Sequence, residues 1–149
     1  MAAIEMLTMA NHAEAHRGML YLSGAGWDNA VIGFAPDGGP SVPFHFGIGV
    51  SVLVPWTETN RPRRLELRIE HEDGGEPLVN LDGEIQVGRP VGIREGTDQR
   101  AVLAVSGELQ FPRPGGYRLV ARGDDSTRTY SFRVQNAGQL ENPPIQAAG

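Results

Sequence analysis

The sequence contains neither cysteine nor lysine among its 149 residues. Without cysteine, a disulfide framework, a thiolate nucleophile and a cysteine-based zinc or iron–sulfur centre are excluded. Without lysine, Schiff-base catalysis and a phosphate-binding P-loop are excluded as well, and all 13 basic residues are arginines. Because 18 acidic residues give a net charge of -5, general binding to nucleic acids or anionic membranes is not expected.

Long hydrophobic runs and helical periodicity are also missing. No segment reaches the roughly 18 apolar residues that a membrane-spanning helix needs. Residues 1–7 lack the basic start of a signal peptide and carry an acid within their apolar stretch. The 20 glycines and 11 prolines interrupt every stretch in which a helical period could develop, so no substantial helix is predicted. These features favour a cytoplasmic protein.

Alternation of apolar and polar residues with a period of two is the dominant pattern. It is clearest in residues 44–54, where the even-numbered positions are apolar. Further strands are expected near residues 4–10, 19–22, 65–71, 81–87, 103–111, 117–121 and 130–134. About eight short strands separated by turns predict an antiparallel two-sheet β-sandwich of immunoglobulin-like or related topology. One domain is expected over residues 1–135, followed by a C-terminal tail over residues 136–149.

The segments 44–54 and 65–71 are expected to form an antiparallel hairpin. The even positions of the first segment then face the core, and Gly47 and Gly49 face outward. An outer face with so little side-chain bulk suggests a cover, either the C-terminal tail or a second subunit. Self-association into a homo-oligomer is therefore an expectation.

Two patterns resemble known families. The turn Pro114-Gly115-Gly116-Tyr117 resembles the Pro-Gly-x-Tyr turn that opens a late strand in many immunoglobulin-like domains. Roughly residues 5–135 also resemble a family of small, uncharacterised bacterial proteins, with Ala25 standing within a run that is all glycine in that family. The segments that carry this second resemblance are residues 20–28, 43–46, 54–61 and 87–90. It implies a β-sandwich fold and no assigned activity.

The histidines and acids do not form a recognisable catalytic or metal-binding pattern. His12 and His16 have a spacing that suits zinc on a helix, but at a strand end this spacing has no such meaning. His45 and His71 are expected on opposite faces, which argues against one shared metal ion. The acids between residues 70 and 82 fit a solvated rim better than a calcium site. We therefore expect no enzyme, metal or cofactor, with catalysis through His45, His71 and nearby acids as a minor alternative.

Trp56 and the arginines near it are the candidate binding residues, because Trp and Arg are enriched at binding hot spots. If the strands alternate in direction, the turns near residues 12–18, 55–64, 88–100 and 122–128 gather at one end. That end carries nine arginines and six acids, and the N-terminus belongs to an acidic opposite end. The alternative is that Trp56 only closes the core and the arginines pair locally. The candidate residues are Trp56, Arg61, Arg63, Arg64, Arg89 and Arg122.

These observations predict a non-enzymatic interaction module. It would bind a protein partner, or copies of itself, through the Arg-rich end that bears Trp56. The alternative is a protein that binds a small ligand, a carbohydrate or an anion, through Trp56 and the arginines. Neither a nucleic acid nor a membrane is an expected partner.

Overall fold

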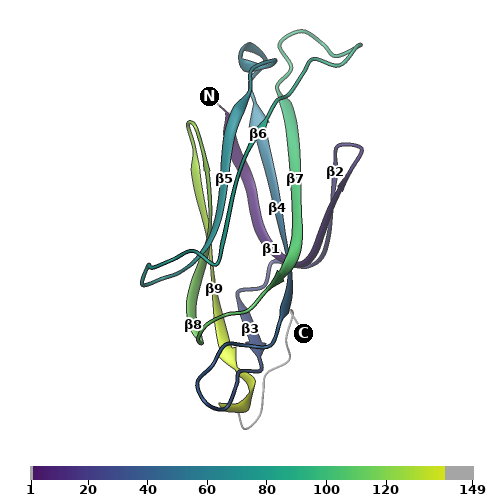
Figure 1. Ribbon diagram of the computed structural model, residues 1–149. Helices are drawn as coiled ribbons and strands as arrows, with labels where there is room; N and C mark the ends of the chain where they lie inside the picture. Colours follow the sequence, from purple (N-terminus) through teal and green to yellow (C-terminus); the bar gives the residue numbers. More distant parts are fainter. Residues whose placement is uncertain (1, 140–149) are drawn as a thin grey trace.

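The computed structural model describes residues 2–139, and its strands form two sheets (Figure 1). The four-stranded sheet has the order β2-β1-β4-β7 and the five-stranded sheet the order β3-β9-β8-β5-β6. The strands are β1 (Ala3–His16), β2 (Met19–Ala25), β3 (Asn29–Ile32), β4 (Phe44–Val54), β5 (Arg63–His71), β6 (Val79–Ile85), β7 (Gln99–Leu109), β8 (Gly115–Gly123) and β9 (Thr127–Asn136). Short 3-10 turns are η1 (Trp56–Glu58) and η2 (Ala137–Gln139). The all-β prediction is therefore confirmed.

The strand count is nine instead of about eight, and the missed strand is β3. It is four residues long, so it offers too little alternation to be recognised in the sequence. It pairs with β9 in the parallel direction, whereas the sequence predicted an entirely antiparallel fold. An immunoglobulin-like topology remains a prediction. Of the predicted tail, residue 136 completes β9 and residues 137–139 form η2, while residues 140–149 lie outside the described part.

Both sheets contribute side chains to one hydrophobic cluster. The even positions of β4 from Phe46 to Val54 are buried, as predicted from their alternation. Strands β5 and β8 of the other sheet add their own buried alternating residues, among them Leu67, Ile69 and Leu119. Tyr117, at the start of β8, is also buried, and its hydroxyl donates to the carbonyl of Arg113 at 2.6 Å. Tyr117 thus ties the loop before β8 to the core.

The predicted hairpin between residues 44–54 and 65–71 is wrong. Strand β4 pairs with β1 and β7, whereas β5 pairs with β6 and β8 in the other sheet. The connection through η1 therefore carries the chain from one sheet to the other. Alternation specifies which face of a strand is buried, but it does not specify the neighbouring strand.

The glycines of β4 are covered by a hairpin of the same chain, in place of the tail or second subunit that the sequence suggested. After pairing with β4 as far as Ala10, strand β1 crosses the outer face of β4 together with β2. A Cβ atom on Gly47 would lie 2.6 Å from the backbone nitrogen of Ala13, and one on Gly49 would lie 2.8 Å from Leu22 Cδ2. The backbone contact above Gly47 requires glycine, whereas the Leu22 side chain above Gly49 is flexible. Because the chain itself covers this face, the bare-face argument for self-association no longer holds.

Candidate functional site

Three loops that the sequence analysis placed together do meet at one end of the molecule (Figure 1). They connect β4 to β5, β6 to β7, and β8 to β9. The backbone amide of Asn60 donates to the carbonyl of Val87 at 2.7 Å, and a guanidinium nitrogen of Arg63 lies 3.6 Å from Asp125 Oδ2. We call this region the loop end. The tip of the β1–β2 hairpin, predicted at the same end, stands out from the side of the molecule instead (Figure 1).

Trp56 and Arg89 form the centre of the loop end. The guanidinium carbon of Arg89 lies 4.0 Å from the centroid of the Trp56 ring. Arg89 Nε donates to Thr59 Oγ1 and Nη2 donates to the Trp56 carbonyl, both at 2.7 Å. The Trp56 amide donates to Asp98 Oδ1 at 3.2 Å. These contacts fasten the long β6–β7 loop to η1, and they cover one face of the indole that a ligand would need for stacking.

Some of the other candidate arginines pair with acids of the same chain, and others are largely exposed. The Arg63 side chain is 10% exposed, and its guanidinium lies 3.0 Å from a Glu58 carboxylate oxygen. Arg61 approaches the same carboxylate at 3.9 Å and is largely exposed. Arg64 donates from Nε to Asp82 Oδ1 at 3.0 Å, and this pair raises the pKa of Arg64 and lowers that of Asp82. Local pairing therefore accounts for much of the predicted basic surface.

The N-terminal strand begins at the loop end, so its predicted place at the opposite end is wrong. Because β1 is antiparallel to β4, its first residues must lie where β4 finishes. Arg128 Nη1 donates to the carbonyl of Ile4 at 3.0 Å. Glu5 pairs with Arg100, and the hydrogen bond from that guanidinium lowers the pKa of Glu5. This additional acid reduces the positive charge that the sequence analysis assigned to the loop end.

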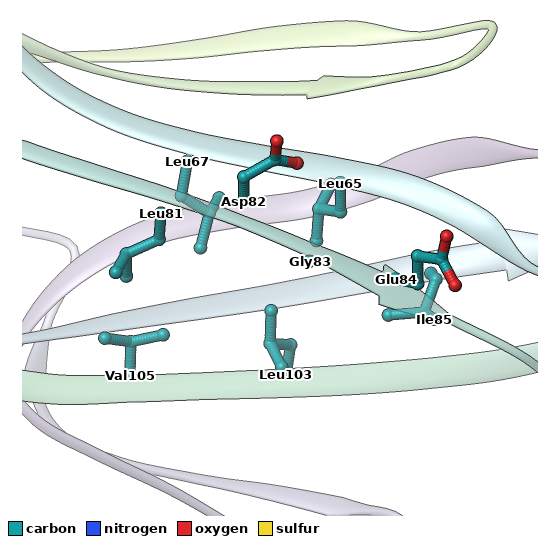
Figure 2. Close-up of a pocket in the computed structure, with 9 residues that line it drawn as sticks. All are labelled: Leu65, Leu67, Leu81, Asp82, Gly83, Glu84, Ile85, Leu103 and Val105. Atoms are coloured by element: carbon teal, nitrogen blue, oxygen red, sulfur yellow. The ribbon is translucent and has the colours of Figure 1, made fainter.

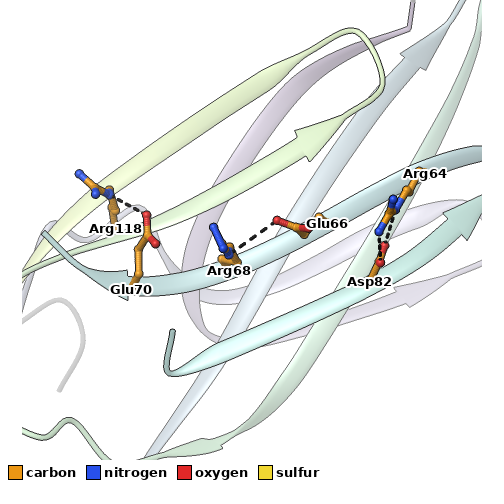
Figure 3. A network of polar contacts seen from close by, with 6 residues as sticks. All are labelled: Arg64, Glu66, Arg68, Glu70, Asp82 and Arg118. Carbon is orange, nitrogen blue, oxygen red and sulfur yellow. Dashed lines mark hydrogen bonds and ion pairs between the residues drawn. The ribbon is translucent and has the colours of Figure 1, made fainter. Parts of the chain in front are cut away.

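Arg64 and Arg122 line an open hollow of about 370 Å³ beside the β8–β9 turn. Glu66 and Asp124 line the same hollow, so its charges are mixed. It continues a row of ion pairs on the outer face of the five-stranded sheet (Figure 3). The row joins Arg64 to Asp82, Arg68 to Glu66 at 3.7 Å and Arg118 to Glu70 at 2.9 Å. The charges of β5 alternate in sign, so Arg68 and Glu66 pair along the strand, while the pairs with Asp82 and Arg118 join β5 to its neighbours β6 and β8.

An apolar hollow lies between β6 and β7, and the sequence analysis missed it. Each of these strands is the last one of its sheet, so the core is open between them. The hollow has a volume of about 120 Å³, and Leu81 on its rim is 40% exposed. Its apolar lining residues are Leu65, Leu67, Leu81, Ile85, Leu103 and Val105 (Figure 2). We call this surface the open side; it depends on strand order, which the sequence pattern does not reveal.

His45 and His71 are separated because β4 and β5 belong to different sheets, and not because they occupy opposite faces of one hairpin as the sequence predicted. His45 instead meets His12 of the crossing hairpin, with 3.0 Å between His45 Nε2 and His12 Nδ1. His12 Nε2 lies 3.1 Å from Glu14 Oε1. Within residues 2–139, no three histidine or carboxylate side chains converge as a metal site would require.

The fold and the open side define a two-sheet, all-β protein with an apolar gap along one side. Residues 5–135 match the model of the family of unknown function DUF6941, and the chain belongs to this family. The matched range agrees with the range over which the sequence resembles uncharacterised proteins. No curated protein matches the chain. In the part of the chain that the structure describes, no helix is long and apolar enough to cross a membrane.

Proposed function

We propose that the protein is a non-enzymatic β-sandwich interaction module that binds a protein partner along its open side. The observation that carries this proposal is the apolar hollow between β6 and β7. Its exposed rim residue Leu81 belongs to β6, and β6 and β7 each lack a neighbouring strand on one edge. An apolar surface next to unpaired strand backbone is the arrangement that binds another strand.

The dimensions of the hollow favour a protein segment over a small molecule. Its volume of about 120 Å³ is well below the roughly 300–1,000 Å³ of ordinary ligand pockets. It has room for the side chains of an added strand, whose backbone would pair with the free edge of β6 or β7. Gly83 supports this proposal. A Cβ atom there would meet only open space, so the middle of β6 is accessible beside the hollow.

The loop end is less suited to be the binding surface than the sequence suggested. Arg63, Arg64 and Arg89 already make ion pairs or hydrogen bonds within the chain. Arg61 and Arg122 remain exposed and could contribute to a partner contact at this end. We therefore propose that the arginines of the loop end mainly hold the three loops together.

The alternative function, binding of a small anion or carbohydrate, has one supporting observation. Arg64 and Arg122 line the same hollow of about 370 Å³. Glu66 and Asp124 oppose an anion there, and Arg89 covers one face of the Trp56 ring that a sugar would use. Calorimetric titration with inorganic phosphate tests this alternative, which predicts a binding heat that disappears in the Arg122→Ala variant.

The interaction proposal is tested by photo-crosslinking in the cells that produce the protein. A photoreactive amino acid is placed at position 81 on the open side, at position 129 on the outer face of β9, or at position 61 in the loop end. We expect a defined protein adduct from position 81 and much less from position 129. Adducts from position 61 alone would move the surface to the loop end, and no adduct from any position would contradict the proposal.

A further inference from the structure

We infer that the strand bound at the open side is β7 of a second copy of this chain, so that the module is a two-fold symmetric dimer. This inference depends on the proposed function and names its partner. The two β7 strands would pair in the antiparallel direction around Ala104, joining two four-stranded sheets into one of eight strands. Three properties of β7 support it: its unprotected edge, its charge pattern and its place beside the apolar hollow.

The free edge of β7 lacks the features that usually prevent strands from pairing. It is 11 residues long, and residues 101–107 carry neither a charge nor a proline. The other outermost strands are shorter or charged: β2 has seven uncharged residues, β3 has four residues, and β6 carries the charges of Asp82 and Glu84. Long, apolar edges without charges or bulges are templates for association, and natural monomers usually protect them.

The charges of β7 are complementary to those of a second, antiparallel β7. Glu108 lies beside His45 and Arg100 beside Leu53, which places both on the outer face of the sheet. A two-fold axis through Ala104 puts Arg100 opposite Glu108 of the second copy, and the symmetry repeats this pair. Arg100 binds Glu5 through Nε and Nη2, so its third nitrogen, Nη1, is available for the additional contact.

Neighbouring registers do not give this complementarity. In one continuous sheet, two residues directly opposite each other point to the same face. If both cores are to lie on the same side of the sheet, the register can therefore shift only by two residues at a time, which moves the axis by one residue. An axis through Leu103 would place Glu108 opposite Asp98 of the second copy, which is a repulsive pair. An axis through Val105 would place Arg100 opposite the uncharged Gln110. The sequence of β7 therefore favours the axis at Ala104.

The inward face of the same pairing extends the apolar hollow. Leu103 and Val105 line the hollow, and the axis at Ala104 places Leu103 of one copy opposite Val105 of the other. Apolar cross-strand pairs of this kind stabilise antiparallel sheets. The two hollows would then adjoin, and Leu81 of each copy would lie at their shared margin.

The test uses the absence of cysteine, which makes a single introduced thiol specific. In the Ala104→Cys variant the two thiols face each other at the axis, where directly opposed Cβ atoms are about 4.5–5.5 Å apart. Mild oxidation should convert most of this variant to a species of twice 16.1 kDa. The matched control Ser131→Cys, exposed on the other sheet, should crosslink at least tenfold more slowly.

Charge reversal provides a second test that does not require a disulfide. Arg100→Glu and Glu108→Arg should each weaken the dimer at least tenfold at low salt, and the variant with both changes should recover most of the affinity. Arg94→Glu, an exposed change in the β6–β7 loop, is the control. Light scattering gives the mass of each variant, and circular dichroism confirms its folding.

Three results would overturn the dimer: a wild-type mass of 16.1 kDa up to the highest soluble concentration, equal crosslinking of both cysteine variants, or no recovery in the double charge variant. An adduct of position 81 with a different protein, together with a monomeric Ala104→Cys variant, would retain the proposed function and reject this inference. Failure of both experiments would reject both.

Discussion

At position 47 the fold requires glycine, because backbone atoms lie where a Cβ atom would be. The strand that crosses above it is backbone, with the Ala13 nitrogen and the His12 carbonyl carbon each 2.6 Å from the position of a Cβ atom. Backbone in a paired hairpin cannot move aside as the end of a flexible side chain does. Gly47→Ala should therefore displace the β1–β2 hairpin and lower the free energy of unfolding by about 1–3 kcal/mol.

Urea denaturation measures this effect, with Gly107→Ala as the matched control in the neighbouring strand. A Cβ atom on Gly107 would lie 3.5 Å from the Phe46 ring, which is an ordinary contact. Its substitution should change the stability much less than that of Gly47. Equal effects of the two substitutions would show that the close approach above β4 is not what requires glycine.

At the scale of residues, the sequence predicted which side chains are buried better than what the exposed ones contact. The even positions of β4 could be assigned to the core because period-two alternation follows directly from strand geometry. The contacts between Arg64 and Asp82 and between His12 and His45 could not be assigned. They depend on which strands become neighbours and on where a hairpin crosses, and neither is encoded locally.

At the scale of elements, the contact between Arg89 and Trp56 connects the β6–β7 loop to η1. Arg89→Ala removes the cation–π contact, worth about 0.5–1 kcal/mol at an exposed site, and two hydrogen bonds. We expect a shift in Trp56 fluorescence and several-fold faster proteolysis between residues 86 and 98. Arg94→Ala, in the same loop, should change neither measurement; faster proteolysis in both variants would contradict this role of Arg89.

The strand elements were largely predictable, whereas their pairing was not. Seven of the segments expected from alternation are long enough to establish a period, but β3 is only four residues long. The chain crosses between sheets at η1, and nothing in residues 55–62 distinguishes such a crossing from a hairpin turn. Strand order, and with it the open side, follows from packing of the whole core.

At the scale of the whole molecule, ion pairs between distant segments make stability depend on pH. Arg100 lowers the pKa of Glu5 and Arg64 lowers that of Asp82, so both carboxyls hold their protons less tightly in the folded chain. Their ordinary values are about 4.3 for Glu and about 3.9 for Asp. The stabilisation is complete above these values and is lost as the pH falls through the lower values of the folded state.

Asp82→Asn tests this linkage, because the amide keeps the shape of the side chain and cannot titrate. Above pH 5 the variant should be slightly less stable than the wild type, and the two should converge as the pH falls through the lowered pKa of the Asp82 carboxyl, where that group becomes protonated in the folded chain. Urea denaturation at a series of pH values measures both. Glu95→Gln, an exposed change in the β6–β7 loop, should leave the difference between pH 5 and pH 3 unchanged. Parallel curves for the wild type and Asp82→Asn would show that the pair with Arg64 contributes nothing to acid sensitivity, as many exposed ion pairs do not.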